Sequence, residues 1–123
     1  MNRVDPGGLL ATPWDIKDIA TEEAAESGLP GAAGGPQDAL RHCLASCMMT
    51  QVYGETAAAV AGLANETWGD ICGQSNADRH MDDNNNIVGI YFGNTGGNCM
   101  TQCTEAVSSG QLITNAGPTG MYH

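Results

Sequence analysis

Four of the five cysteines form two pairs with the same spacing. Cys43 and Cys47 lie four residues apart, and so do Cys99 and Cys103. A separation of four residues puts both thiols of a pair on one face of a helix. Two helices packed antiparallel could then be joined by two disulfides or by either one alone, Cys43–Cys103 and Cys47–Cys99. Four cysteines allow three pairings, and the sequence does not choose among them.

Two other uses of these cysteines compete with disulfides. A zinc site is one, although Cys-x-x-x-Cys differs from the Cys-x-x-Cys spacing of a zinc knuckle. Buried free thiols are the other, because cysteine also packs as a small hydrophobic residue. Cys72 lies outside both pairs. If disulfides form, they indicate that the protein works in an oxidising compartment.

The composition favours one all-α domain over residues 1–123, with four to five short helices in a compact bundle. Hydrophobic residues make up 41% of the chain, yet there are only one Phe, two Trp and three Tyr. The alanine and methionine that dominate instead suit closely packed helices better than a β-sandwich. Apolar spacing and helix-end signals predict helices over residues 13–27, 36–53, 55–68, from 76 or 78 to 92, and 98–108. Residues 1–12 are expected to form a loose arm and residues 110–123 an irregular tail.

The charge balance limits the partners. Fourteen acidic and four basic residues give a net charge of −10, which repels phosphate backbones and anionic membranes. We therefore expect no nucleic-acid partner. No stretch approaches the roughly 20 apolar residues that span a bilayer, so we expect no transmembrane segment. The first residues lack the apolar run of a signal peptide, so export would use another route, or the chain is part of a longer one.

The first cluster of reactive residues lies in the second predicted helix. Asp38 and His42 are four residues apart and share a helix face, with Arg41 beside them. Asp38 could orient the imidazole, as it would for a general base or a metal ligand. The alternative is that Asp38 interacts with the helix dipole and that His42 is a surface residue.

The second cluster lies in the fourth predicted helix. Asp82 is expected to face the same way as Asn85 and Asn86, with Gly89 one turn further on, where it would let helices approach closely. Three successive asparagines weaken a helix, so buried hydrogen bonds should compensate for them. A plain loop over residues 82–86 is the alternative. The alternating polar residues Asp82-x-Asn84-x-Asn86 also resemble a calcium-binding loop, but the glycine and the closing glutamate of that motif are missing.

These residues suggest a polar site between the second and fourth helices. His42 would act as a general base or a metal ligand, and Asp82 and Glu66 would supply carboxylates for acid chemistry or metal binding. Arg41 and Asn85 would stabilise a developing oxyanion. His80 is a candidate second histidine ligand. The sequence does not identify a cofactor, but His42, His80 and Asp82 could hold a divalent metal.

The two clusters also carry a family resemblance. The pattern Gly-Pro-x-Asp-Ala-x-Arg-His, then a glutamate, then Met-Asp-x-x-Asn-Asn-x-x-Gly resembles a helical domain family of bacterial secreted and polymorphic-toxin proteins, often C-terminal in Rhs-type polypeptides. The similarity covers about residues 35–93, roughly half of the chain. Where the family usually shows His-Glu, this chain has Asn65-Glu66. The matching residues are Gly35, Pro36, Asp38, Ala39, Arg41, His42, Glu66, Met81, Asp82, Asn85, Asn86 and Gly89.

The resemblance implies an antibacterial toxin or effector that leaves the producing cell through a specialised system such as type VI secretion. Together with the charge and the cysteines, it predicts a hydrolase that acts in the periplasm or extracellular space on an envelope component such as peptidoglycan. A cognate immunity protein would be its partner.

Two alternatives remain open at this point. The chain could be a non-enzymatic, cysteine-stapled binding module in which Asp38, His42 and the asparagines form a closed structural network. The run from Gly34 to Ala39, followed by a helix with cysteines, is also similar to the loop and first catalytic helix of secreted phospholipases A2. Here, however, Cys43 follows the histidine and the loop has no cysteine, so a lipase is the lesser alternative.

Overall fold

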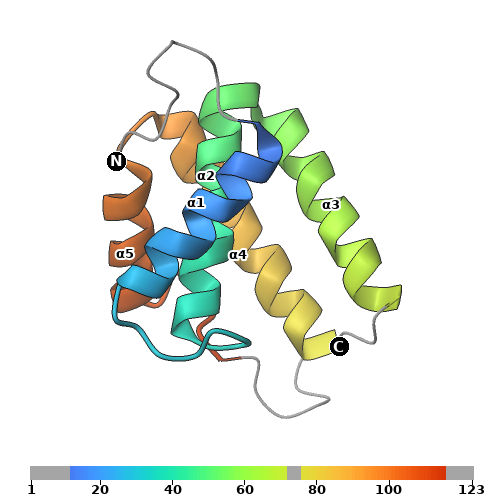
Figure 1. Ribbon diagram of the computed structural model, residues 1–123. Coiled ribbons are helices and arrows are strands. Elements are labelled where there is room, and N and C mark those ends of the chain that lie inside the picture. Colours follow the sequence, from blue (N-terminus) through green and yellow to red (C-terminus); the bar gives the residue numbers. More distant parts are fainter. Residues whose placement is uncertain (1–11, 72–75, 116–123) are drawn as a thin grey trace.

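The computed structural model describes the backbone of residues 12–71 and 76–115 and the side chains of residues 12–63 and 79–115. Over this part of the chain the fold is all-α, as predicted, with five helices and no strand (Figure 1). The helices are α1 (Pro13–Glu26), α2 (Pro36–Tyr53), α3 (Glu55–Ile71), α4 (Asn76–Thr95) and α5 (Cys99–Ser109).

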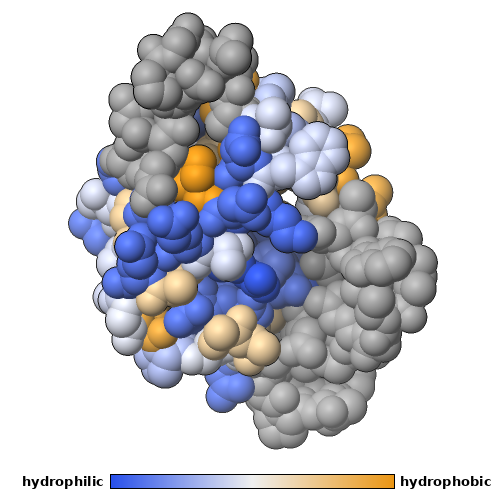
Figure 2. Space-filling view, in the orientation of Figure 1, coloured by the Kyte–Doolittle hydropathy of each residue, from blue (hydrophilic) through white to orange (hydrophobic). Residues whose placement is uncertain are grey.

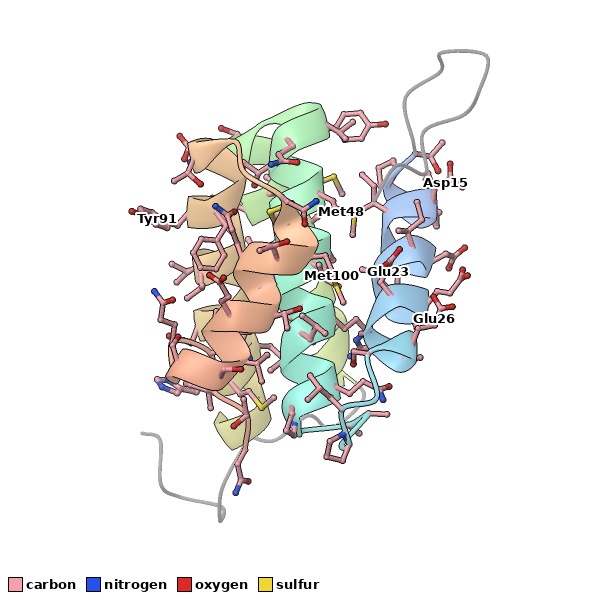
Figure 3. All side chains as sticks on the ribbon, turned by 90° about the vertical axis from the view of Figure 1, so that its left-hand side faces the viewer. Asp15, Glu23, Glu26, Met48, Tyr91 and Met100 are labelled. Atoms are coloured by element: carbon pink, nitrogen blue, oxygen red, sulfur yellow. A yellow bond between two sulfur atoms is a disulfide. The ribbon has the colours of Figure 1, made fainter. Side chains whose placement is uncertain are left out.

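Helix α2 is the centre of the bundle. It contacts each of the other four helices, and ten of its eighteen residues are buried. Figure 1 shows α1 crossing in front of α2, with α5 and α3 on opposite sides. Met48 of α2 is part of the buried core, and the partly buried Met100 of α5 packs against that core. Glu26 of α1 and Tyr91 of α4 are exposed (Figure 3). The side chains that face several neighbours at once are therefore those of α2.

Local signals account for several helix ends. Thr12 and Asp15 form a capping box at the start of α1, in which the Thr12 hydroxyl accepts from Asp15 N–H and the Asp15 carboxylate accepts from Thr12 N–H. The hydrogen bond from Thr12 N–H, together with the Thr12 hydroxyl beside the carboxylate, holds the pKa of Asp15 below its usual value, because both favour the charged carboxylate. Asn98 caps α5, which ends at Gly110 in the left-handed conformation.

Two predicted boundaries are wrong. Helix α3 continues to Ile71, about one turn beyond the predicted end, so part of the predicted 69–77 loop is helical. Helix α4 continues through Gly93 to Thr95, because this glycine packs against α2 and does not end the helix. In the predicted tail, residues 111–115 have no regular structure, but Leu112 is buried. The predicted arm lies outside the described residues except for Thr12, the N-cap of α1.

Two glycines on α4 allow its backbone to touch α2. A Cβ atom on Gly89 would lie 2.4 Å from the carbonyl oxygen of Cys43. A Cβ atom on Gly93 would lie 2.5 Å from the Cβ of Thr50. Real Cβ atoms do not approach other atoms so closely, so neither position accepts a side chain without separating the helices. The close approach predicted for Gly89 is confirmed.

The expectation that disulfides join the helix of Cys43 and Cys47 to that of Cys99 and Cys103 is confirmed, and both of the candidate bridges are present between α2 and α5. Cys43 pairs with Cys103 and Cys47 with Cys99, so the zinc and free-thiol alternatives are wrong for these four residues. Cys72 lies outside the described residues. None of the helices, over the residues that the structure describes, combines the length and apolar character that crossing a bilayer requires.

The glycine contact can be tested with Gly89→Ala. We expect a loss of about 2–3 kcal/mol or more in the free energy of unfolding, because the added methyl group overlaps the backbone of α2. Gly97→Ala is the control, since its Cβ would meet only the end of the flexible Gln102 side chain. Urea denaturation measures both variants, and equal stabilities would contradict the close contact.

The disulfides can be tested by thiol counting and by the double variant Cys47→Ser/Cys99→Ser. Because Cys43–Cys103 remains in this variant, Cys47–Cys99 closes only the short loop between the two bridges, and its loss should cost about 2–3 kcal/mol in the chain-entropy model. Unreduced, denatured protein should expose one thiol, that of Cys72, and five free thiols would refute both bridges. Cys72→Ser is the matched control in the denaturation experiment.

Candidate functional site

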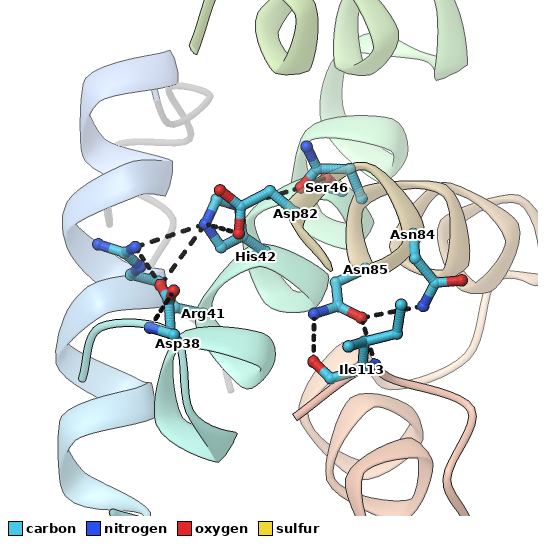
Figure 4. Close-up of polar contacts among 10 residues, drawn as sticks. Asp38, Arg41, His42, Ser46, Asp82, Asn84, Asn85 and Ile113 are labelled. Atoms are coloured by element: carbon cyan, nitrogen blue, oxygen red, sulfur yellow. Dashed lines mark hydrogen bonds and ion pairs between the residues drawn. The ribbon is translucent and has the colours of Figure 1, made fainter. Parts of the chain in front are cut away.

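Two carboxylates and one imidazole meet where α2 contacts α4 (Figure 4). His42 Nε2 lies 3.5 Å from Asp38 Oδ1 on the same helix and 3.1 Å from Asp82 Oδ1 on α4. The three side chains are only 9–12% exposed. The predicted convergence of Asp38, His42 and Asp82 from positions about forty residues apart is therefore confirmed.

The orientation of His42 is set by α4. His42 Nδ1 lies 3.2 Å from Asn86 Oδ1, which also accepts a hydrogen bond from the Ser46 hydroxyl at 3.3 Å. An amide oxygen can only accept, so Nδ1 of the imidazole is the donor and carries the hydrogen. In the neutral ring the lone pair is then on Nε2, the nitrogen that faces the two carboxylates.

Asp38 is held in place from two directions. The backbone N–H of Gly34 donates to Asp38 Oδ2 at 2.9 Å, and Arg41 forms a salt bridge with Asp38 Oδ1. The same Arg41 Nη2 lies 3.4 Å from His42 Nε2. Arg41, whose side chain is 38% exposed, thus neutralises Asp38 at the edge of the cluster. The guanidinium of Arg41 thus binds the Asp38 carboxylate in this structure, and its role toward a developing oxyanion stays a prediction.

The cluster suits proton transfer. An imidazolium formed by proton transfer to Nε2 would be paired with the two carboxylates already beside it. The same three atoms also fit a divalent cation. Donors about 2.1 Å from one ion lie about 3.0–3.4 Å from each other in octahedral or tetrahedral geometry, close to the two distances observed here. The hydrogen bond at Nδ1 is the kind that orients metal-binding histidines.

Asn85 does not join the cluster. Its Nδ2 donates to the carbonyl oxygen of Ile113 at 2.9 Å, and its Oδ1 accepts from Ile113 N–H at 2.8 Å (Figure 4). The expectation that Asn85 faces the same way as Asp82 and Asn86 is wrong. At about 100° per residue, Asn85 and Asn86 project to different sides of α4. The fully buried Asn85 fastens the segment after α5 to α4 and lies apart from the cluster of Asp38, His42 and Asp82.

The remaining predicted residues lie apart from this cluster or outside the described part of the chain. His80 is exposed and is two positions from Asp82, which puts it on another side of α4, away from the three grouped ligand atoms. The side chain of Glu66 lies outside the described residues, so the middle motif of the resemblance is not placed. Ser46 was not predicted, although its position four residues after His42 puts both on one face of α2.

A cavity of about 290 Å³ opens beside His42, between α1, α2 and α3. His42, Ser46 and Asn86 form part of its polar lining, and Ile16, Met49 and Ala58 are among its apolar walls. Hydrophilic side chains surround a hollow in the middle of the face in Figure 2. His42 lines this open cavity, whereas Asp38 and Asp82 are not among its lining residues, so the choice between an active site and a structural network stays a prediction.

Comparison with models of known protein families finds no match for this sequence. No solved structure matches it either. The site is therefore interpreted from its own geometry.

The separate roles of the two asparagines can be tested with Asn85→Ala. Loss of the amide leaves the N–H and carbonyl groups of Ile113 without these partners, which should cost about 1–3 kcal/mol of stability. Asp83→Ala, at an exposed neighbouring position on α4, is the control. Chemical denaturation measures the free energy of unfolding of both variants. If Asn85→Ala is as stable as the control, Asn85 does not have the structural role described here.

Proposed function

We propose that the protein is a hydrolase that acts outside the cytoplasm on a component of the bacterial cell envelope, as an antibacterial effector. One observation carries the proposal. His42 has Nδ1 fixed by Asn86 and Nε2 directed at Asp38 and Asp82, and its ring lines a cavity. A histidine oriented in this way beside a cavity is suited to activating water.

The proposed chemistry uses His42 as the group that exchanges protons. The imidazole takes a proton from water at Nε2, and Asp38 and Asp82 stabilise the charge that forms. A divalent cation held by the same three side chains would supply Lewis-acid activation of that water. Arg41 would have to release Asp38 in part for the cation to bind, because both cations use Asp38 Oδ1.

The disulfides and the charge support the location and substrate class. Disulfides persist in oxidising compartments such as the periplasm, where envelope components are accessible. The net charge of −10 disfavours a nucleic-acid substrate. Delivery by a specialised secretion system such as type VI, and inhibition by a cognate immunity protein that covers the cavity, complete the proposal. The family resemblance of the two motifs points in the same direction. Peptidoglycan is one such envelope substrate.

The proposal is tested with His42→Ala. Purified protein is incubated with cell-wall sacculi and with phospholipid vesicles, with chelator and after return of Zn²⁺ or Mn²⁺, and toxicity is measured in cells that export it to the periplasm. We expect His42→Ala to lower hydrolysis about a hundredfold or more with the fold intact. His80→Ala is the matched control, since this histidine is exposed and outside the cluster.

Thermal melting on the same preparations separates catalysis from stability. If His42 is structural, its loss leaves Asp38 and Asp82 without the imidazole and lowers stability by about 1–3 kcal/mol, with full activity for each folded molecule. That result would favour the binding-module alternative. Activity that chelator removes and metal restores would assign the cluster to a metal ion, and activity unaffected by chelator would assign it to proton transfer alone.

A further inference from the structure

The cavity beside His42 has apolar walls contributed by three helices. Ile16 of α1 and Ala58 of α3 are both 2% exposed, and Met49 of α2 is 8% exposed. Ala61 of α3 extends this wall, and Trp14, which is 76% exposed, contributes from the first turn of α1. Such walls accept hydrocarbon readily, whereas the hydroxyl groups of a sugar would lose hydrogen bonds to water there.

One polar group in this cavity is a donor without an acceptor. Asn86 is 9% exposed, and its Oδ1 accepts from both His42 and Ser46, which fixes the orientation of the amide. Its Nδ2 is therefore on the other side, where Gly62 also lines the cavity; a Cβ atom on Gly62 would lie 3.1 Å from Nδ2. Within the described part of the chain, no hydrogen-bond acceptor pairs with this Nδ2.

We infer that the cavity binds the acyl chain of a lipid-like ester or amide, whose carbonyl oxygen accepts a hydrogen bond from Asn86 Nδ2. The inference rests on the proposed function and names its substrate class. The apolar walls bind the chain, and the amide donor places the carbonyl carbon beside His42. Gly62 keeps this position open, because a side chain there would press on Nδ2.

The reaction is the hydrolysis of an acyl bond. The water oxygen bonds to the carbonyl carbon, and one water proton passes to His42. Asn86 Nδ2 donates to the oxygen on which negative charge develops, as oxyanion-hole donors do. The bond to the leaving oxygen or nitrogen then breaks, and the leaving group takes the proton from His42. One water is consumed, and the products are a carboxylic acid and an alcohol or amine.

Chain length is the direct test. Esters of 4-nitrophenol with acyl chains of two to ten carbons are compared, together with binding of decanoate followed by Trp14 fluorescence in a Trp68→Phe background. We expect the affinity of the protein for the ester to rise about fourfold with each methylene group of the acyl chain until the cavity is full. Ala61→Leu should weaken decanoate binding at least about tenfold, because its larger side chain fills part of the cavity. Ala59→Leu, at an exposed position on the same helix, is the matched control.

Asn86→Asp tests the donor separately. It keeps an oxygen for His42 and Ser46 and removes the Nδ2 donor, so hydrolysis of the 4-nitrophenyl esters should fall about a hundredfold or more. Melting curves verify that each variant is folded. The dependence of hydrolysis on chain length is measured on the unmodified protein, so that test does not depend on the folding of a variant.

The results distinguish this inference from the proposed function. Saturable decanoate binding that Ala61→Leu weakens supports the acyl-chain site. If decanoate binds in this way but no ester is cleaved, the acyl-chain site stands and the hydrolase proposal does not. Hydrolysis of sacculi without decanoate binding would overturn the acyl-chain inference and leave the hydrolase in place. Ester hydrolysis that does not depend on chain length would also overturn it. Absence of both binding and hydrolysis would overturn both proposals.

Discussion

Backbone contact between α2 and α4 is the constraint on which the site depends. Gly89 and Gly93 let α4 lie against the carbonyl oxygens of Cys43 and Cys47. At this separation the side chain of His42 reaches both Asp82 and Asn86. Helices held apart by ordinary side chains would leave the Asp82 carboxylate and the His42 imidazole without these partners, and burial would then destabilise them.

Helix α2 contributes side chains both to the site and to the core. Cys43 and Cys47 connect it to α5, and His42 and Ser46, each one residue earlier, face α4 and the cavity. Each disulfide therefore restrains the part of α2 that carries a site residue. The Asn85–Ile113 hydrogen bonds do the same for α4, since they hold the neighbour of Asn86 in place.

The cavity links the fold to the proposed chemistry. Three helices enclose it, and its polar end is formed by side chains of α2 and α4 that also bind one another. Asn86 is the residue on which the two proposals converge. Its oxygen orients His42, and its nitrogen remains available to a ligand. The amide thus couples the position of the base to the position of a substrate carbonyl.

The sequence alone determined that the fold is helical and about where each helix lies, because apolar spacing and caps are local signals. The four-residue separation of the cysteines allowed the two bridges between α2 and α5, but the tertiary structure selected them from three possible pairings. It also identified Asp38, His42, Asp82 and Asn86. Tertiary structure decided what local spacing does not contain: that Asn85 turns toward Ile113, that Gly93 is a contact and not a stop, and that His80 stays outside the cluster. These outcomes depend on the rotation of α4 about its axis against α2, which is set by packing between residues far apart in the chain.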